Sequence, residues 1–247
     1  MRMLILGIGD AFTSMHFSSG ALIEGPQGYV LIDCSDLIHR ALREGTSKAG
    51  WNIDIAGIDD IIVTHLHGDH CNGLESFGFH RRIMRLQKPA MIRPRLHVTE
   101  PVARRLWERL GPAMHTPIGD NRPSTLEDYF EVRTLDPSHP ATIAGFTVQC
   151  RFTKHPVPTI GLLIGDGEKT LGWSSDTPFE QAHVDWLSQA DLIVHESNTG
   201  TSHTPIELLN GLPPSIRGKM RLIHLPDNFD STRTTIKILR EGDVLQP

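Results

Sequence analysis

The segment over residues 64–70 constrains this chain more than any other. It reads Thr-His-Leu-His-Gly-Asp-His and directly follows the apolar run Ile-Ile-Val at 61–63. A predicted buried strand thus ends in a tight loop that carries three imidazoles and one carboxylate. A loop of this kind presents its donors at a sheet edge, and this donor set suits zinc or a similar divalent ion. The alternative is a polar loop with accidental histidines, which the density of the pattern disfavours.

This motif resembles the signature of the metallo-β-lactamase superfamily. In that superfamily the first two histidines bind one metal ion, and the aspartate and the last histidine bind a second. The resemblance therefore implies that His65 and His67 bind one ion. It implies that Asp69 and His70 bind the other, and that a third histidine, a bridging carboxylate and a final histidine follow.

Three later motifs resemble those missing ligands as they occur in the ribonuclease Z branch. His155 precedes Val-Pro and a further predicted strand, Asp176 stands in Ser-Ser-Asp-Thr, and His224 ends a strand in Leu-Ile-His-Leu-Pro. His139 is the competitor of His155, but no strand follows it. An N-cap of the next helix is the alternative for Asp176. The implied ligands are His65, His67, His155 and Asp176 for one ion, and Asp69, His70, Asp176 and His224 for the other.

The same branch implies roles for further polar residues. Asp33 ends a predicted strand near the metal loop, where it would orient a ligand, unless it caps the following helix. His203 matches a histidine that does not bind metal, and we expect it to be the general acid, oriented by Glu196. The alternative for His203 is an N-cap of a helix that begins near Pro205. Asp69, His203 and Glu196 form the predicted catalytic set.

Strands that alternate with helices predict an α/β layered fold, which the resemblance narrows to a four-layer αβ/βα sandwich. We expect one metallo-hydrolase domain over residues 1–247. The predicted strands cover 3–8, 21–24, 29–33, 59–64, 90–93, 130–134, 146–152, 169–173, 191–194 and 220–223. The predicted helices cover 37–43, 72–85, 100–110 and 178–187, residues 111–128 are expected to be irregular, and 232–245 form a closing helix or strand.

Composition limits the cellular compartments and the classes of partner that we expect for this chain. The chain has 247 residues, a net charge of −5 and three cysteines, Cys34, Cys71 and Cys150. Sparse cysteines without CxxC spacing predict a reducing compartment, and we expect the cytoplasm, because no signal peptide or membrane span is present. Negative charge disfavours a nucleic-acid partner and still admits a small anionic substrate at the metals. The sequence leaves open whether the chain forms a homodimer.

A ligand set of histidines and carboxylates leaves positions for water, which is typical of catalytic sites. We expect two divalent ions per chain, zinc first and manganese or iron as alternatives. The predicted function is a phosphodiesterase of small phosphodiesters such as cyclic nucleotides, with a metal-bridging hydroxide as nucleophile.

Three other functions remain alternatives at this point. Lactonases of the superfamily commonly carry a tyrosine where this chain has Phe179, which disfavours an ester, lactone or thioester hydrolase. Endonucleases that process the 3′ end of tRNA carry a basic arm between the third histidine and the bridging aspartate. Residues 156–175 leave room only for two strands and a turn. A non-catalytic, metal-dependent binding protein is the third alternative, and the complete ligand set disfavours it.

Overall fold

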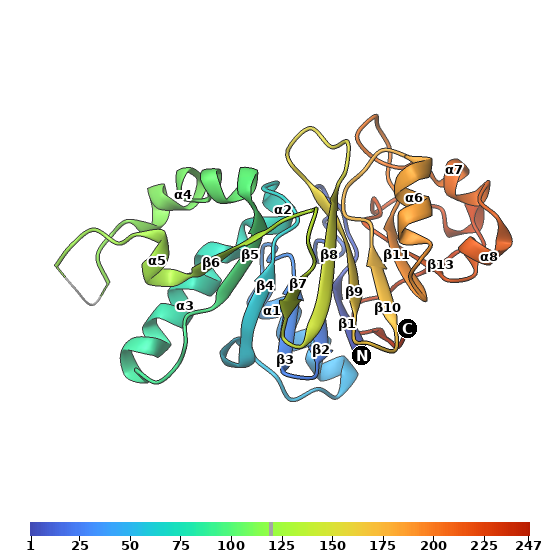
Figure 1. Ribbon diagram of the computed structural model, residues 1–247. Helices are drawn as coiled ribbons and strands as arrows, with labels where there is room; N and C mark the ends of the chain where they lie inside the picture. The colour runs from blue at the N-terminus through green and yellow to red at the C-terminus, as the bar shows by residue number, and fades with distance from the viewer. Residues whose placement is uncertain (119–120) are drawn as a thin grey trace.

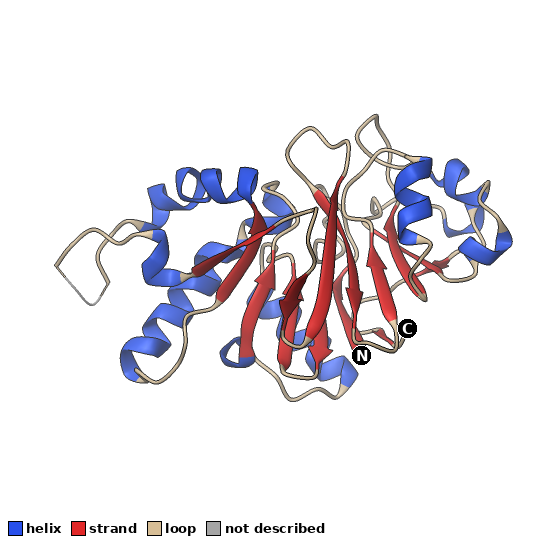
Figure 2. Ribbon diagram, in the orientation of Figure 1, coloured by secondary structure: helices blue, strands red, loops and turns tan. Residues whose placement is uncertain are grey.

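Two mixed seven-stranded sheets pack face to face between two layers of helices (Figures 1 and 2). The computed structural model describes residues 1–118 and 121–247. In sheet order, the first sheet contains β14 (Val244–Leu245), β1 (Arg2–Gly7), β2 (Gly20–Gly25), β3 (Gly28–Ile32), β4 (Ile58–Ile62), β5 (Arg95–Thr99) and β6 (Glu131–Leu135). The second contains β13 (Lys237–Ile238), β12 (Met220–Ile223), β11 (Leu192–Glu196), β10 (Thr170–Trp173), β9 (Ile160–Gly165), β8 (Phe146–Phe152) and β7 (Ala141–Ile143).

The helices cover the outer faces of the sheets and complete the predicted four-layer αβ/βα sandwich. Those on the first sheet are α1 (Ile38–Ala49), α3 (Gly73–Gln87), α4 (Glu100–Met114) and α5 (Leu126–Tyr129). Those on the second sheet are α6 (Gln181–Leu187), α7 (Ile206–Asn210) and α8 (Pro214–Arg217). The short α2 (Gly68–Cys71) and the 3₁₀ turns η1 (Ile55–Gly57) and η2 (Ser231–Arg233) lie in connections. Among the described residues, no helix is both long and apolar enough to span a bilayer.

Alternation along the strands builds the layers. On β1, Met3 and Ile5 belong to the core between the two sheets, whereas Leu4 and Leu6 belong to the core beneath the helices. Because side chains of a strand alternate between faces, a strand buried on both sides is continuously apolar. The apolar run that precedes the metal loop is explained in the same way, since Ile61 and Ile62 belong to different cores.

The prediction of a strand over 90–93 is wrong, because that segment is an exposed loop and β5 begins at Arg95. The strand was missed because Arg95 and His97 carry polar side chains toward Asp60 on β4. Arg95 donates hydrogen bonds of 2.6 and 2.5 Å to the two oxygens of Asp60, and His97 Nε2 lies 2.8 Å from Oδ1. Burial raises the pKa of the Asp60 carboxyl, but these contacts hold that pKa below its ordinary value.

The segment over 111–128 is more regular than predicted, and residues 119 and 120 lie outside the described part of the chain. Helix α4 continues past Pro112 to Met114, and α5 follows a capping box. In that box the backbone N–H of Thr125 donates to the Asp128 carboxylate at 2.7 Å. The pattern Thr-Leu-Glu-Asp would have predicted this short helix.

The other corrections concern the second half of the chain. The helix predicted over 178–187 begins only at Gln181 after Glu180, so Asp176 does not cap it. Helix α7 begins after Pro205 without a side-chain cap, which removes the capping alternative for His203. The closing segment forms two edge strands, β13 beside β12 and β14 beside β1.

Arg81 on α3 is fully buried and ties the helix to the start of β4. Its Nη1 atom donates to the carbonyl of Ile58 at 2.6 Å, and its Nη2 atom donates to the carboxylate of Asp59 at 2.6 Å. It also donates to the backbone carbonyls of Ile55, Ala56 and Ile92. Loss of this guanidinium would leave several buried acceptors without a donor.

Arg81→Met should therefore lower the free energy of unfolding by about 2–4 kcal/mol, measured by urea denaturation. The matched control is Arg104→Met on α4, where the arginine is exposed and, among the described residues, pairs only with Glu100 one turn away. That variant should lose less than about 0.5 kcal/mol. Equal losses in the two variants would contradict the role assigned to Arg81.

Candidate metal centre

The metal loop is clamped onto the segment that follows β3. The N–H of Cys34 donates to the carbonyl of His70 at 2.8 Å, and the N–H of Gly73 donates to the carbonyl of Cys34 at 2.9 Å. A Cβ atom on residue 73 would lie 2.1 Å from the carbonyl oxygen of Ser35, so this approach requires glycine. The clamp fixes the backbone from which the loop's donors project. Cys71 is a buried free thiol.

One cluster of donors combines His65, His67, His155 and Asp176, whose ligand atoms all lie within 4.8 Å of one another. His67 Nδ1 lies 3.2 Å from His65 Nε2 and 3.0 Å from His155 Nε2. Asp176 Oδ2 lies 3.6 Å from His65 Nε2 and 3.8 Å from His155 Nε2. His139, in contrast, pairs with Asp136 on an exposed loop and does not join the described cluster.

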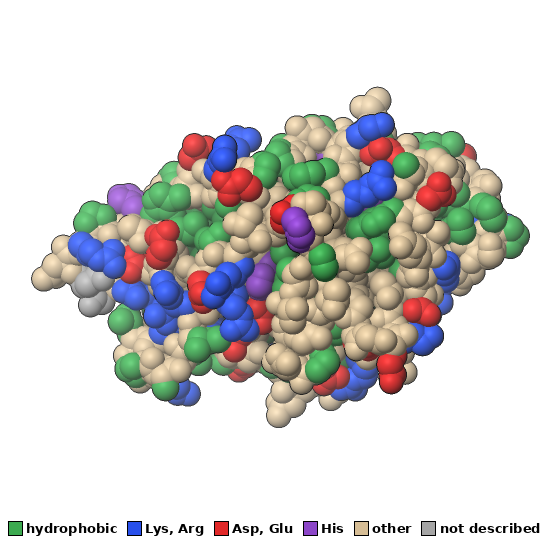
Figure 3. Space-filling view, in the orientation of Figure 1, with side chains coloured by type: hydrophobic (Ala, Val, Ile, Leu, Met, Phe, Trp, Pro, Cys, Tyr) green, Lys and Arg blue, Asp and Glu red, His purple; other side chains and the backbone are tan. Residues whose placement is uncertain are grey.

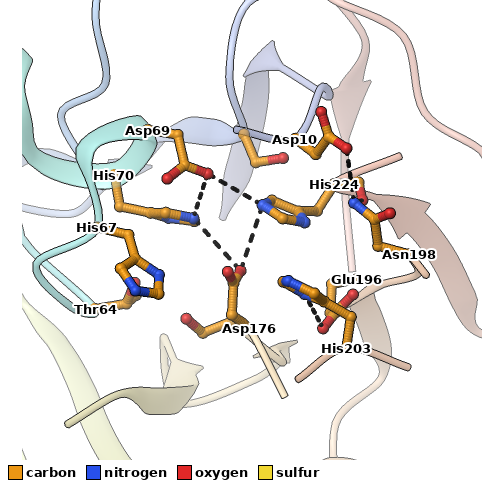
Figure 4. A network of polar contacts seen from close by, with 12 residues as sticks. Asp10, Thr64, His67, Asp69, His70, Asp176, Glu196, Asn198, His203 and His224 are labelled. Carbon is orange, nitrogen blue, oxygen red and sulfur yellow. Dashed lines mark hydrogen bonds and ion pairs between the residues drawn. The ribbon is translucent and has the colours of Figure 1, made fainter. Parts of the chain in front are cut away.

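A second cluster lies on the other side of the same carboxylate (Figure 4). Asp69 Oδ2 lies 3.1 Å from His70 Nε2 and 3.2 Å from His224 Nε2. Asp176 Oδ1 lies 3.4 Å from His70 Nε2 and 3.6 Å from His224 Nε2. The two oxygens of Asp176 thus face two different donor clusters.

Both clusters fit a divalent cation. Zinc–nitrogen bonds of about 2.0–2.1 Å in a tetrahedral site place neighbouring donors about 3.3–3.4 Å apart. The observed separations bracket that value. The buried Nε2 atom of His70 also has no hydrogen-bond partner among the described residues. A proton between two imidazole nitrogens satisfies only that pair, whereas a cation among them would satisfy every donor of a cluster.

The outer nitrogens of three of these histidines are oriented by neighbouring groups. Asp33 Oδ2 lies 2.8 Å from His70 Nδ1, and Asp33 also accepts hydrogen bonds from the N–H and hydroxyl of Thr64 at 2.7 and 2.9 Å. Helix α1 begins after Leu37, so Asp33 does not cap it. The Thr64 hydroxyl lies 3.0 Å from His65 Nδ1, and His155 Nδ1 lies 3.2 Å from the carbonyl of Ser202. Such contacts fix the ring orientation of a metal ligand.

Three residues next to the ends of strands at the site have a strained backbone. Asp33 after β3, Ser175 after β10 and His224 after β12 have φ values of 59°, 53° and 59°. The left-handed region is unfavourable for residues other than glycine, and such strain clusters at functional sites. These turns aim Asp33, Asp176 and His224 inward from their strands.

His203 lies beside the metal clusters and is held by Glu196 at the end of β11. Its Nδ1 atom lies 3.0 Å from Glu196 Oε1, which also accepts the N–H of Thr177 at 2.9 Å. The His203 ring stacks on His224 with centroids 5.3 Å apart. His203, Asp176 and His224 also form a third set of possible metal ligands. Burial raises the pKa of Glu196. Burial lowers the pKa of His203, but the hydrogen bond and charge of Glu196 hold it above its ordinary value.

His195, which precedes Glu196, and Phe179, which the sequence singled out, lie away from the donors. His195 is buried and donates from Nδ1 to the Glu196 carbonyl at 2.7 Å, and burial lowers its pKa to about 4. It is therefore a neutral core residue. Phe179 packs on the core beneath α6 and α7.

A cavity of about 640 Å³ opens above the clusters. His67, Asp69, Asp176, His203 and His224 reach it, together with residues from the loops after β1, β11 and β12. The sequence did not predict the latter residues, which include Asp10, Phe12, Asn198 and Asp227. Their position just after predicted strands is the signal that would have found Asp10 and Asn198. Asn198 Nδ2 donates to Asp10 Oδ2 at 2.9 Å. A dashed line marks this contact in Figure 4.

Comparison with known proteins agrees with this geometry. The sequence profile of a family described as "Anti-Pycsar protein Apyc1" matches residues 1–243. Anti-Pycsar protein Apyc1 of Paenibacillus sp. (strain J14) is 31% identical over 246 residues, which cover 94% of this chain and 92% of that protein.

Solved structures share the fold at lower identity. The metallo-β-lactamase fold protein YhfI of Bacillus subtilis has a TM-score of 0.80 at 18% identity and covers 99% of this chain and 98% of its own. The short form of human tRNase Z (ELAC1) has a TM-score of 0.71 at 17% identity, with 100% and 99% covered. The expected metallo-β-lactamase fold is thus confirmed. The chain belongs to the Anti-Pycsar protein Apyc1 family.

Proposed function

We propose that this enzyme is a phosphodiesterase that hydrolyses small phosphodiesters such as cyclic nucleotides, with two divalent ions, preferably zinc. The observation that carries the proposal is the position of Asp176. Its two oxygens face separate donor clusters, and His203 lines the same cavity. This arrangement suits an in-line displacement in which an attacking and a leaving oxygen are both stabilised. Membership of the Apyc1 family supports the same class of substrate.

The cavity favours a small anionic substrate. None of the described residues that line it is lysine or arginine, so the charge of a phosphodiester would be balanced by the metals. The segment between His155 and Asp176 forms only the β9–β10 hairpin and its flanking loops, without an arm. The face in Figure 3 carries a group of Lys and Arg side chains on its left half, but acidic side chains lie among them. These features disfavour tRNA as the substrate.

Seven residues would hold the metals. His65, His67, His155 and Asp176 would bind one ion, and Asp69, His70, Asp176 and His224 the other. When bound, two such ions neutralise charge on the scissile group and activate water as the nucleophile at neutral pH. Asp33 and Thr64 keep the rings of His70 and His65 in place for this task.

We assign protonation of the leaving oxygen to His203. The contact of Nδ1 with Glu196 fixes the ring, and it leaves Nε2 as the nitrogen available to a substrate in the cavity. Asp69 faces the same cavity and holds His224 from the other side. An alkoxide is a poor leaving group, so a positioned proton donor accelerates its departure.

The substrate class is tested with metal-loaded enzyme and a panel of substrates. A 3′,5′-cyclic nucleotide and a p-nitrophenyl phosphodiester should give higher kcat/KM than a lactone, a thioester or a β-lactam, and excess chelator should abolish turnover. Comparable or faster lactone hydrolysis would overturn the phosphodiesterase proposal. Efficient cleavage of tRNA precursors would show that the missing arm does not exclude that substrate.

The role of His203 is tested by leaving-group dependence. His203→Ala should keep its metal content and lose about 10²–10⁴ in kcat on a cyclic nucleotide. It should lose far less on a p-nitrophenyl diester, whose leaving group needs no proton. The control is His80→Ala, an exposed histidine on α3, which should change neither rate. Equal losses on both substrates, or loss of metal, would refute proton donation.

A further inference from the structure

Phe12 is the most exposed large apolar side chain among the described residues, and it lines the metal cavity. It is 92% exposed, on the loop between β1 and β2. Met15, three residues after Phe12 on the same loop, is 70% exposed but does not line the cavity. An isolated exposed apolar residue needs no explanation, but one at the rim of a catalytic cavity points to a ligand.

The loop that carries Phe12 is held in one position by both of its flanks. The N–H of Phe12 donates to Asp10 Oδ1 at 2.9 Å, and Asp10 Oδ2 accepts from Asn198 at 2.9 Å. On the other side, the N–H and hydroxyl of Ser14 donate to Asp227 Oδ2 at 2.7 and 2.8 Å. The Thr13 hydroxyl donates to the other oxygen of Asp227. The aromatic ring is therefore presented on a fixed support, which reduces the entropic cost of binding.

The cavity is polar at its floor and more apolar at its rim. Asp69, Asp176 and the metal-facing histidines form its polar floor, whereas Ala11, Phe12 and Pro226 supply apolar surface from the flanking loops. A ligand that matches this gradient carries an anionic group at one end and a flat apolar group at the other. A nucleotide has this form, and about 640 Å³ is sufficient for one.

We infer that Phe12 is the platform on which the nucleobase of the substrate stacks while the phosphodiester lies at the metals. This inference rests on the proposed phosphodiesterase function and names its substrates as base-bearing diesters. Stacking on an aromatic face needs the flat π surface of the ring and not only its apolar area. Phe12 would thus set the preference for substrates that carry a base.

The test compares a 3′,5′-cyclic nucleotide with the 3′,5′-cyclic phosphate of 1,2-dideoxyribose, which lacks the base. Phe12→Ala should lower the preference for the nucleotide by about tenfold, chiefly through KM. Phe12→Tyr should restore the preference, and Phe12→Leu should not. Met15→Ala, on the same loop and outside the cavity, is the matched control and should leave KM and kcat unchanged for both substrates.

Three results would overturn the inference. The first is an equal effect of Phe12→Ala on both substrates, and the second is full rescue by Phe12→Leu. The third is loss of a dimer in Phe12→Ala by light scattering, which would assign the ring to a subunit contact.

A binding measurement separates this inference from the proposed function. In saturation-transfer NMR with a nucleoside 5′-monophosphate, the base protons should receive saturation from the wild-type protein and much less from Phe12→Ala. That result would support the platform even if the panel showed no phosphodiester hydrolysis. Absence of saturation at the base protons of the wild-type complex would refute the platform while leaving hydrolysis intact.

Discussion

The carboxylate of Asp176 is the contact that both donor clusters share, and the arrangement of the site depends on it. One oxygen faces His65 and His155, and the other faces His70 and His224. A buried carboxylate in contact with several histidines is costly unless its charge is balanced. A cation on each side would balance that charge and satisfy the converging imidazoles. The fold can therefore be understood as a means of bringing these groups to one carboxylate.

The sandwich achieves this because its strands end at one edge. β3, β4, β10, β11 and β12 each end beside a residue of the site, and the two sheets bring strand ends distant in sequence together. The contact between His155 and His67 spans 88 residues, and that between His224 and Asp69 spans 155. Left-handed turns at Asp33, Ser175 and His224 complete the placement. Packing of the apolar cores supports the strain of these turns.

Much of this architecture could be predicted from the sequence. Dense donors after an apolar run identified the metal loop, and the order of the later motifs brought His155, Asp176 and His224 to it. β5 could not be found by hydrophobic pattern, because the polar side chains of Arg95 and His97 contact Asp60 on the neighbouring β4. The fixed position of Phe12 could not be predicted either, since its loop is hydrogen-bonded to Asp227, more than 200 residues away. Local patterns carry no information about such partners.

The most direct test of the bridging role of Asp176 is anomalous X-ray diffraction from zinc-loaded crystals. Two peaks should appear on opposite sides of the Asp176 carboxylate, about 3.5–4 Å apart. One should lie among His65, His67 and His155, and the other among Asp69, His70 and His224. Crystals of Asp176→Ala should lose at least one of them. A single fully occupied peak in the wild type, or two unchanged peaks in the variant, would contradict the account.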